Sequence, residues 1–210
     1  MAVVSALRIS ARPARGFVAM GLVFGSFAAQ LPVLKAQIGA DDATFGLALL
    51  GSPVGLILTL WLAPLFDRRL AALSLPGSAA FLGATMVLTG FTAAPVAFFV
   101  AMVLVGLSSG TLDIVSNARV ADMEAEHRAP LMNANHGMFS VAYALSAVAT
   151  GAAREAGFGP VFIFACVAVL VWLLAFGMRI APADESEVRT PGLPPPGMPG
   201  LAVLLCGGIV

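Results

Sequence analysis

A polar segment inside a long apolar stretch carries the residues best suited to chemistry. In SSGTLDIVSNARVADME, residues 108–124, Asp113 and Asn117 stand where a membrane helix is usually apolar. On a helical wheel they share one narrow stripe with Gly106 and Gly110. Glycines four residues apart let another helix approach closely, so we interpret this glycine pair as a packing seam. Ionisable groups within a span usually mark an ion or solute path, and we therefore interpret Asp113 as functional. The alternative is a structural carboxylate that a neighbouring hydroxyl or amide satisfies.

A second polar stripe follows in the next apolar stretch. Its members share one helical face and are Asn133, His136, Ser140, Tyr143 and Ala147. His136 is the one histidine within a predicted span, and histidine titrates near neutral pH. Three interpretations of His136 stay open. It has a functional role, or it is a neutral imidazole bonded to a neighbouring helix, or its ring is simply solvated near the inner headgroups. We favour a structural role for Ser140 and Tyr143 and keep Ser140 among the candidate cavity contacts.

Gln30 is the most polar long side chain of the first apolar stretch. It either faces the same cavity as Asp113 or bonds to a backbone group that Pro32 has freed. We include Gln30 among the candidate contacts of the cavity.

The second apolar stretch carries signals for its start and for a bend. Asp41 and Asp42 precede Thr44 and are candidates for the N-cap of this helix. Pro53, within GSPVG, is expected to kink it.

Catalytic and metal sites are not expected. Asp113, His136 and Ser140 are the residue types of a hydrolase triad, but no Gly-x-Ser-x-Gly elbow is present and Ser140 lies one turn from His136 on the same helix. An intramembrane hydrolase is therefore a minor alternative. Cys166 and Cys206 lie in apolar runs at no metal-ligand spacing and are expected to be small buried residues. We predict a protein that is not an enzyme and that carries no metal or cofactor.

The composition requires that most of these residues sit in a membrane. Of 210 residues, 60% are hydrophobic and 10% are charged, and the mean hydropathy is +0.98. Soluble domains carry about 25% charged residues. The net charge is zero, which gives no reason to expect a nucleic-acid partner. A helix needs about 20 apolar residues to cross a bilayer, and six such stretches are present. They are residues 17–34, 44–65, 70–91, 95–118, 132–152 and 158–178.

The two ends of the sequence need separate treatment. A seventh apolar run, residues 200–210, is about 16 Å long as a helix and too short to span, so we interpret it as the start of a seventh helix. The first apolar run, 17–34, follows three arginines and resembles a cleaved signal peptide in that respect. Its length and the five runs after it favour an uncleaved first helix.

The distribution of basic residues predicts a cytoplasmic N-terminus in the inner membrane, because cytoplasmic loops carry an excess of Lys and Arg. With that orientation the outer side holds only Lys35 and Arg154, and Arg119 lies near the inner end of the fourth span. The cytoplasmic side holds Arg8, Arg12, Arg15, Arg68, Arg69, Arg128, Arg179 and Arg189. The Pro- and Gly-rich segment 179–199 is then a cytoplasmic linker.

Six spans, a cytoplasmic linker and the start of a seventh helix resemble the N-terminal half of a major facilitator superfamily transporter. APLFDRR, residues 63–69, resembles the family's G-x-x-x-D-R-x-G-R-R signature and matches it at Asp67 and Arg68, with Ala63 and Leu70 in place of two glycines. The resemblance implies a gating motif, in which Asp67 accepts from a helix N-terminus or pairs with an arginine when the cytoplasmic side is shut. The alternative is a pair of ordinary headgroup-level charges.

A second resemblance is to the fucose-permease-like branch of this family. It rests on GLSSGTLDIVSNARVADME, followed by NANHGMFSVAYALSAVATG. It implies that Asp113 faces the central cavity and is a candidate protonation site, with Asn117 beside it, and that His136 and Ser140 match the start of the fifth helix. Sugar symporters of this branch also use an acid in the first helix, where this chain has Gln30. Sugar as the substrate and coupling to a proton therefore stay open.

The sequence thus predicts an all-α integral membrane protein with a six-helix bundle over residues 1–178, a linker over 179–199 and a truncated seventh helix over 200–210. The expected function is transport of a small solute by an alternating-access secondary transporter, a symporter if a proton is coupled. Its expected partners are the bilayer and either a C-terminal six-helix half or a second copy of the chain. The alternative function is a non-transporting membrane receptor or assembly partner with the same fold.

Overall fold

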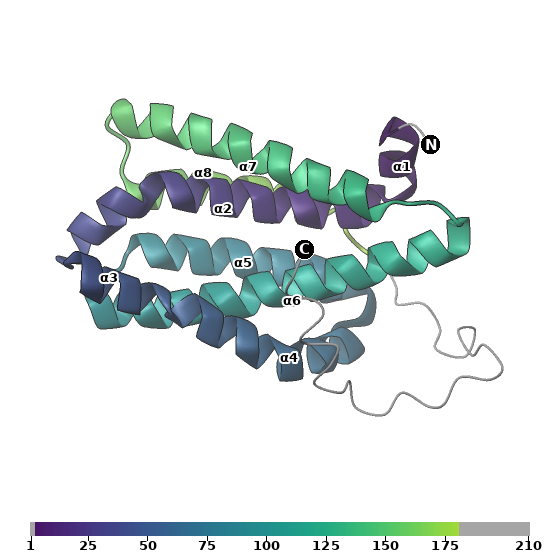
Figure 1. Ribbon diagram of the computed structural model, residues 1–210, viewed down its shortest axis with the longest axis horizontal. Coiled ribbons are helices and arrows are strands. Elements are labelled where there is room, and N and C mark those ends of the chain that lie inside the picture. The colour runs from purple at the N-terminus through teal and green to yellow at the C-terminus, as the bar shows by residue number, and fades with distance from the viewer. Residues whose placement is uncertain (1–2, 181–210) are drawn as a thin grey trace.

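The computed structural model describes residues 3–180, and these residues form an all-helical bundle without strands (Figure 1). This confirms the predicted all-α membrane architecture. The linker from residue 181 onward and the seventh-helix segment 200–210 lie outside the described residues. The helices are α1 (Val3–Ile9), α2 (Ala11–Gln37), α3 (Asp42–Leu49), α4 (Gly51–Leu70), the short 3-10 helix η1 (Ala71–Leu73), α5 (Ser74–Gly90), α6 (Pro95–His127), α7 (Met132–Glu155) and α8 (Pro160–Ala175).

Each predicted span coincides with helix in the structure, although the helices differ in their ability to cross a bilayer alone. Three segments are long and apolar enough to do so, Ala11–Gln37, Asp42–Gly90 and Pro95–His127. The second of these is 49 residues long and includes two predicted spans. α8 is apolar but has only 16 residues, and α7 has 24 residues that include many small and polar side chains. α8 is therefore limited by its length alone, whereas α7 is less apolar than the other spans.

The second predicted span is divided between α3 and α4. α3 ends at Leu49 and α4 begins at Gly51, so Pro53 occupies the first turn of α4 rather than a kink within one helix. Proline is tolerated there because the first-turn N–H groups have no intrahelical acceptor. Asp41 is the N-cap of α3, as predicted, and its Oδ1 accepts the Thr44 N–H at 2.7 Å.

Three helix pairs make the most extensive contacts, α2 with α7, α4 with α6, and α5 with α8, and the first two pairs run side by side in Figure 1. Glycines allow the close approach. A Cβ on Gly21 or Gly25 would overlap a backbone carbonyl of α7, and a Cβ on Gly106 would overlap the carbonyl of Ser52 on α4. Gly110 lies against Leu56 and Thr59 of α4. The interpretation of Gly106 and Gly110 as a packing seam is therefore confirmed.

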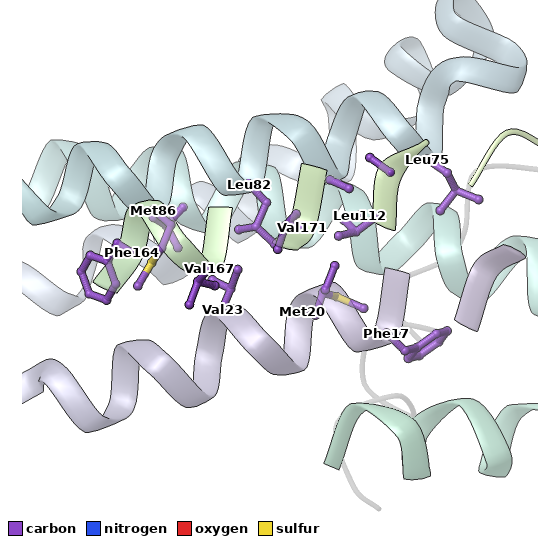
Figure 2. Packing of buried hydrophobic residues seen from close by; sticks show 14 of the residues in the cluster. Phe17, Met20, Val23, Leu75, Leu82, Met86, Leu112, Phe164, Val167 and Val171 are labelled. Carbon is purple, nitrogen blue, oxygen red and sulfur yellow. The ribbon is translucent and has the colours of Figure 1, made fainter. Parts of the chain in front are cut away.

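α2 contacts α5, α6, α7 and α8. Its inner face places Met20 and Val23 against apolar side chains of α5 and α8, which include Leu82, Met86 and Val171 (Figure 2). All five side chains are buried. Because α7 covers another face of α2, this helix is packed on two sides.

Cys166 of α8 is exposed on the surface of the bundle, which corrects the expectation that it is buried. α8 carries apolar residues around its whole circumference, so the sequence does not show which side faces the core. Cys206 lies outside the described residues.

Candidate functional site

Two residues of the predicted polar stripe of α6, Gly110 and Asp113, line a pocket of about 360 Å³ between four helices. The pocket has apolar walls with a few polar groups, which is the usual character of a small-molecule site. Its lining side chains and one glycine come from α2, α4, α6 and α7. They are Phe17, Met20, Phe24, Ser52, Leu56, Ser109, Gly110, Asp113, His136 and Phe139.

Asp113 supplies the one carboxylate among the lining residues, and Asn117 orients it. The Nδ2 of Asn117 donates to Asp113 Oδ1 at 2.9 Å and to the Asp113 backbone carbonyl at 2.9 Å. Both residues are half-buried. Asn117 itself is not part of the lining, so its place is beside the carboxylate rather than in the pocket. Among the described residues, Asp113 Oδ2 has no protein donor and remains open to a ligand.

His136 reaches the same pocket from α7. Its exposed ring packs edge-on against Phe17, with 4.9 Å between ring centroids and 70° between planes. The structure thus brings His136 and Asp113, from two different helices, to one pocket. Within residues 3–180, no group of three or more His, Cys, Asp or Glu side chains is arranged to hold a metal ion.

Ser140 is not brought into the pocket. Its Oγ donates to the backbone carbonyl of His136 at 3.2 Å, one turn back along α7. This local bond is common for serine in helices and requires no ligand. The structural interpretation of Ser140 therefore describes its position here better than the cavity interpretation.

Gln30 also lies apart from the pocket. Its side chain is completely buried, and neither Oε1 nor Nε2 has a hydrogen-bond partner among the described residues. Ser26, one turn earlier on α2, is buried with an unpartnered Oγ in the same way. The structure thus gives Gln30 neither the cavity position nor the bond to freed backbone that the sequence suggested.

Away from the pocket, a partly buried ion pair joins α4 to α6. The Nη2 of Arg119 lies 2.6 Å from Oδ1 of Asp67, and the Arg119 side chain is only 4% exposed. Arg68, the other residue of the predicted gating motif, is exposed and forms no ion pair within residues 3–180. Sequence reasoning did not select Arg119 as functional. The signal was available, because a charge near the end of an apolar stretch needs a partner.

Comparison with known proteins gives one relevant relative, and no family model matches the chain. An uncharacterized MFS-type transporter from Yersinia pestis is 27% identical over 184 residues. The alignment covers 86% of this chain and 46% of that transporter. The chain therefore spans about half the length of the curated relative that it matches. The relative has no stated substrate, so the resemblance to the fucose-permease-like branch stays a prediction.

Proposed function

We propose that this chain, whose similarity to an MFS-type transporter supports membership of the major facilitator superfamily, forms one half of a secondary transporter for a small solute. The observation that carries the proposal is the position of Asp113. A half-buried carboxylate opens onto a pocket formed by four helices of an apolar membrane bundle. Charges inside membrane proteins are expensive and are usually retained for a path or a binding site. The proposed activity is movement of a solute, not catalysis.

The proposed mechanism is alternating access, in which this bundle moves against a second bundle around the pocket. The second bundle is a C-terminal six-helix half or a second copy of the chain. Rigid-body motion requires a bundle that holds its shape. The close α2–α7 and α4–α6 contacts at glycines support this property.

Asp113 is the proposed charged group of the cavity and the candidate proton site. This role is supported by the orientation of the carboxylate by Asn117 and by an Oδ2 with no donor among the described residues. His136 is proposed as a polar contact at the same pocket. Ser140 and Gln30 are not retained as contacts, because neither side chain lines the pocket.

The ion pair between Asp67 and Arg119 is the proposed cytoplasmic latch. It joins the end of α4 to α6, on the side where the excess of Lys and Arg places the cytoplasm. The N-terminus is then cytoplasmic and the protein resides in the inner membrane. Since both residues belong to this bundle, the ion pair would act by holding the cytoplasmic end of α4 in place on α6, where the second bundle closes against it.

Reconstitution with a mixture of solutes tests the proposal and requires no identified substrate. The complete gene product is placed in proteoliposomes with a proton gradient, incubated with a small-molecule cell extract, and the lumen is analysed by mass spectrometry. We expect at least one solute to accumulate, and Asp113→Asn to abolish this accumulation without loss of membrane insertion. Asp122→Asn, the same substitution elsewhere on α6, serves as the control. Normal accumulation by Asp113→Asn would contradict the role of Asp113, and no accumulation of any solute would contradict transport.

A further inference from the structure

The charge of the pocket is one-sided. Asp113 is the one carboxylate among the lining residues, and no lysine or arginine is among them. The arginine on the same helix, Arg119, is buried and paired with Asp67. It therefore does not neutralise Asp113. A pocket of this kind attracts cations and repels anions, and low-dielectric walls strengthen both effects.

The walls of the pocket are aromatic. Phe17 and Phe24 come from α2 and Phe139 comes from α7. The rings of Phe24 and Phe139 lie 6.5 Å apart between centroids, at an angle of 61°. Aromatic ring faces bind ammonium groups, and they also cover the apolar body of a ligand.

The pocket offers few hydrogen-bonding side chains for a sugar. Besides Asp113, the polar lining side chains are Ser52, Ser109 and His136. The Oγ of Ser109 already donates to the backbone carbonyl of Gly106 at 3.3 Å. A sugar buried here would leave many hydroxyl groups without partners, which is unfavourable. An ammonium group needs one well-placed carboxylate and tolerates apolar surroundings when its charge is paired.

We propose that the pocket binds an organic cation with an aromatic or aliphatic body, such as a protonated amine, with its ammonium group on Asp113 and its body against the rings of Phe24 and Phe139. This inference rests on the proposed function, since it names the solute class for the same pocket. A volume of about 360 Å³ accommodates a ligand of this size.

Three soluble probes of matched size separate the charge classes. They are phenethylammonium, the neutral 2-phenylethanol and the anionic 3-phenylpropionate. Their binding to the purified complete gene product in detergent is measured by calorimetry. We expect phenethylammonium to bind at least about tenfold more tightly than 2-phenylethanol, because a charge-assisted bond is made only by the cation. We expect no binding of 3-phenylpropionate.

Two variants assign this preference to the pocket. In Asp113→Asn the ratio of the affinity for the cation to that for the neutral probe should fall to near one. Phe139→Leu should weaken the binding of both probes to a similar extent. Asp122→Asn, outside the pocket on the same helix, should change neither. Equal binding of the three probes, tighter binding of the anion, or an unchanged cation preference in Asp113→Asn would each overturn the inference.

Flux distinguishes this inference from the proposed function. Labelled phenethylammonium is offered to proteoliposomes that contain the same protein. Asp113-dependent binding without flux would support the ligand class and contradict transport. Accumulation of neutral or anionic solutes, with no binding of the cation, would support transport and contradict the ligand class.

Discussion

The Nη2 of Arg119 on α6 lies 2.6 Å from the Oδ1 of Asp67 on α4, and the arginine side chain is almost completely buried. The two residues are 52 positions apart in the sequence. A buried guanidinium is stable only while its charge is paired, so this contact fixes how the end of α4 sits on α6.

Asp67→Asn should therefore destabilise the bundle. The substitution leaves the Arg119 charge buried without its partner, and we expect a loss of about 2 kcal/mol in the free energy of unfolding. Thermal unfolding in detergent measures it. Arg68→Gln, one residue further along and exposed, should have little effect. If Asp67→Asn and Arg68→Gln behaved alike, the ion pair would not contribute to stability. The double variant Asp67→Asn/Arg119→Gln should recover part of the loss, because it removes the unpaired charge.

Gly106→Val should disrupt the contact between α4 and α6. A Cβ at this position meets the backbone carbonyl of Ser52, and backbone cannot rotate away as a side chain does. We expect the free energy of unfolding to fall by about 1–3 kcal/mol, as measured by thermal unfolding. Gly137→Ala is the control, because no atom lies within 4 Å of a Cβ placed there. Gly137→Ala should change the free energy of unfolding by no more than about 1 kcal/mol, in the stabilising direction, because alanine is the better helix former. Equal losses in the two variants would contradict the packing seam.

Gln30→Met should be neutral or stabilising. The polar atoms of Gln30 are buried without partners among the described residues, and an apolar side chain of similar size removes that unfavourable burial. Asn135→Leu provides the contrast, because the Nδ2 of Asn135 donates to Ser10 at 2.9 Å and to the Leu131 carbonyl at 2.8 Å. We expect Asn135→Leu to lower the free energy of unfolding by about 1 kcal/mol. A large loss of solute binding in Gln30→Met, with the fold intact, would instead restore Gln30 as a cavity contact.

Asp41 gives a pH-dependent prediction at the start of α3. The backbone N–H of Thr44 donates to its carboxylate and holds the pKa of Asp41 below the ordinary aspartate value. A lowered folded-state pKa means that the charged cap stabilises α3 above the unfolded-state pKa and loses this effect as the pH falls through the folded-state value. Wild type should therefore exceed Asp41→Asn in thermal stability at neutral pH, and the difference should shrink as the pH falls below the ordinary aspartate pKa. A difference that persists in acid would assign the effect to something other than the carboxylate charge.

The sequence predicted the parts of this structure that depend on short-range rules. The apolar stretches marked the helices, since a span requires a run of suitable length. Gly106 and Gly110 were correctly identified as a seam from their spacing, and Asp41 as a cap from its position before Thr44. Each of these inferences involves residues within about one helical turn of one another.

Features that depend on how helices are rotated against each other could not be predicted in the same way. The pairing of Arg119 with Asp67 and the meeting of His136 with Asp113 join different helices. The burial of Gln30 is of the same kind, because α2 contacts neighbours on several sides and the sequence does not state which side each residue faces. A kink of one continuous helix was expected at Pro53, whereas α3 ends at Leu49 and a separate helix, α4, begins at Gly51.

Accessibility of the pocket from the two sides of the membrane tests the central claim most directly, because it requires no substrate. Ser52 lines the pocket on α4, and Ser52→Cys is a small change. The variant is made in a background with Cys166→Ala and Cys206→Ala and treated with a membrane-impermeant thiol reagent, in intact cells and in inverted vesicles. Ser26→Cys is the control, since Ser26 is fully buried outside the pocket and should not react from either side. An alternating-access transporter predicts that Ser52→Cys reacts from both sides, and that Asp67→Asn raises the reaction from the cytoplasmic side. Reaction from one side only, unchanged by Asp67→Asn, or no reaction from either side would contradict the account.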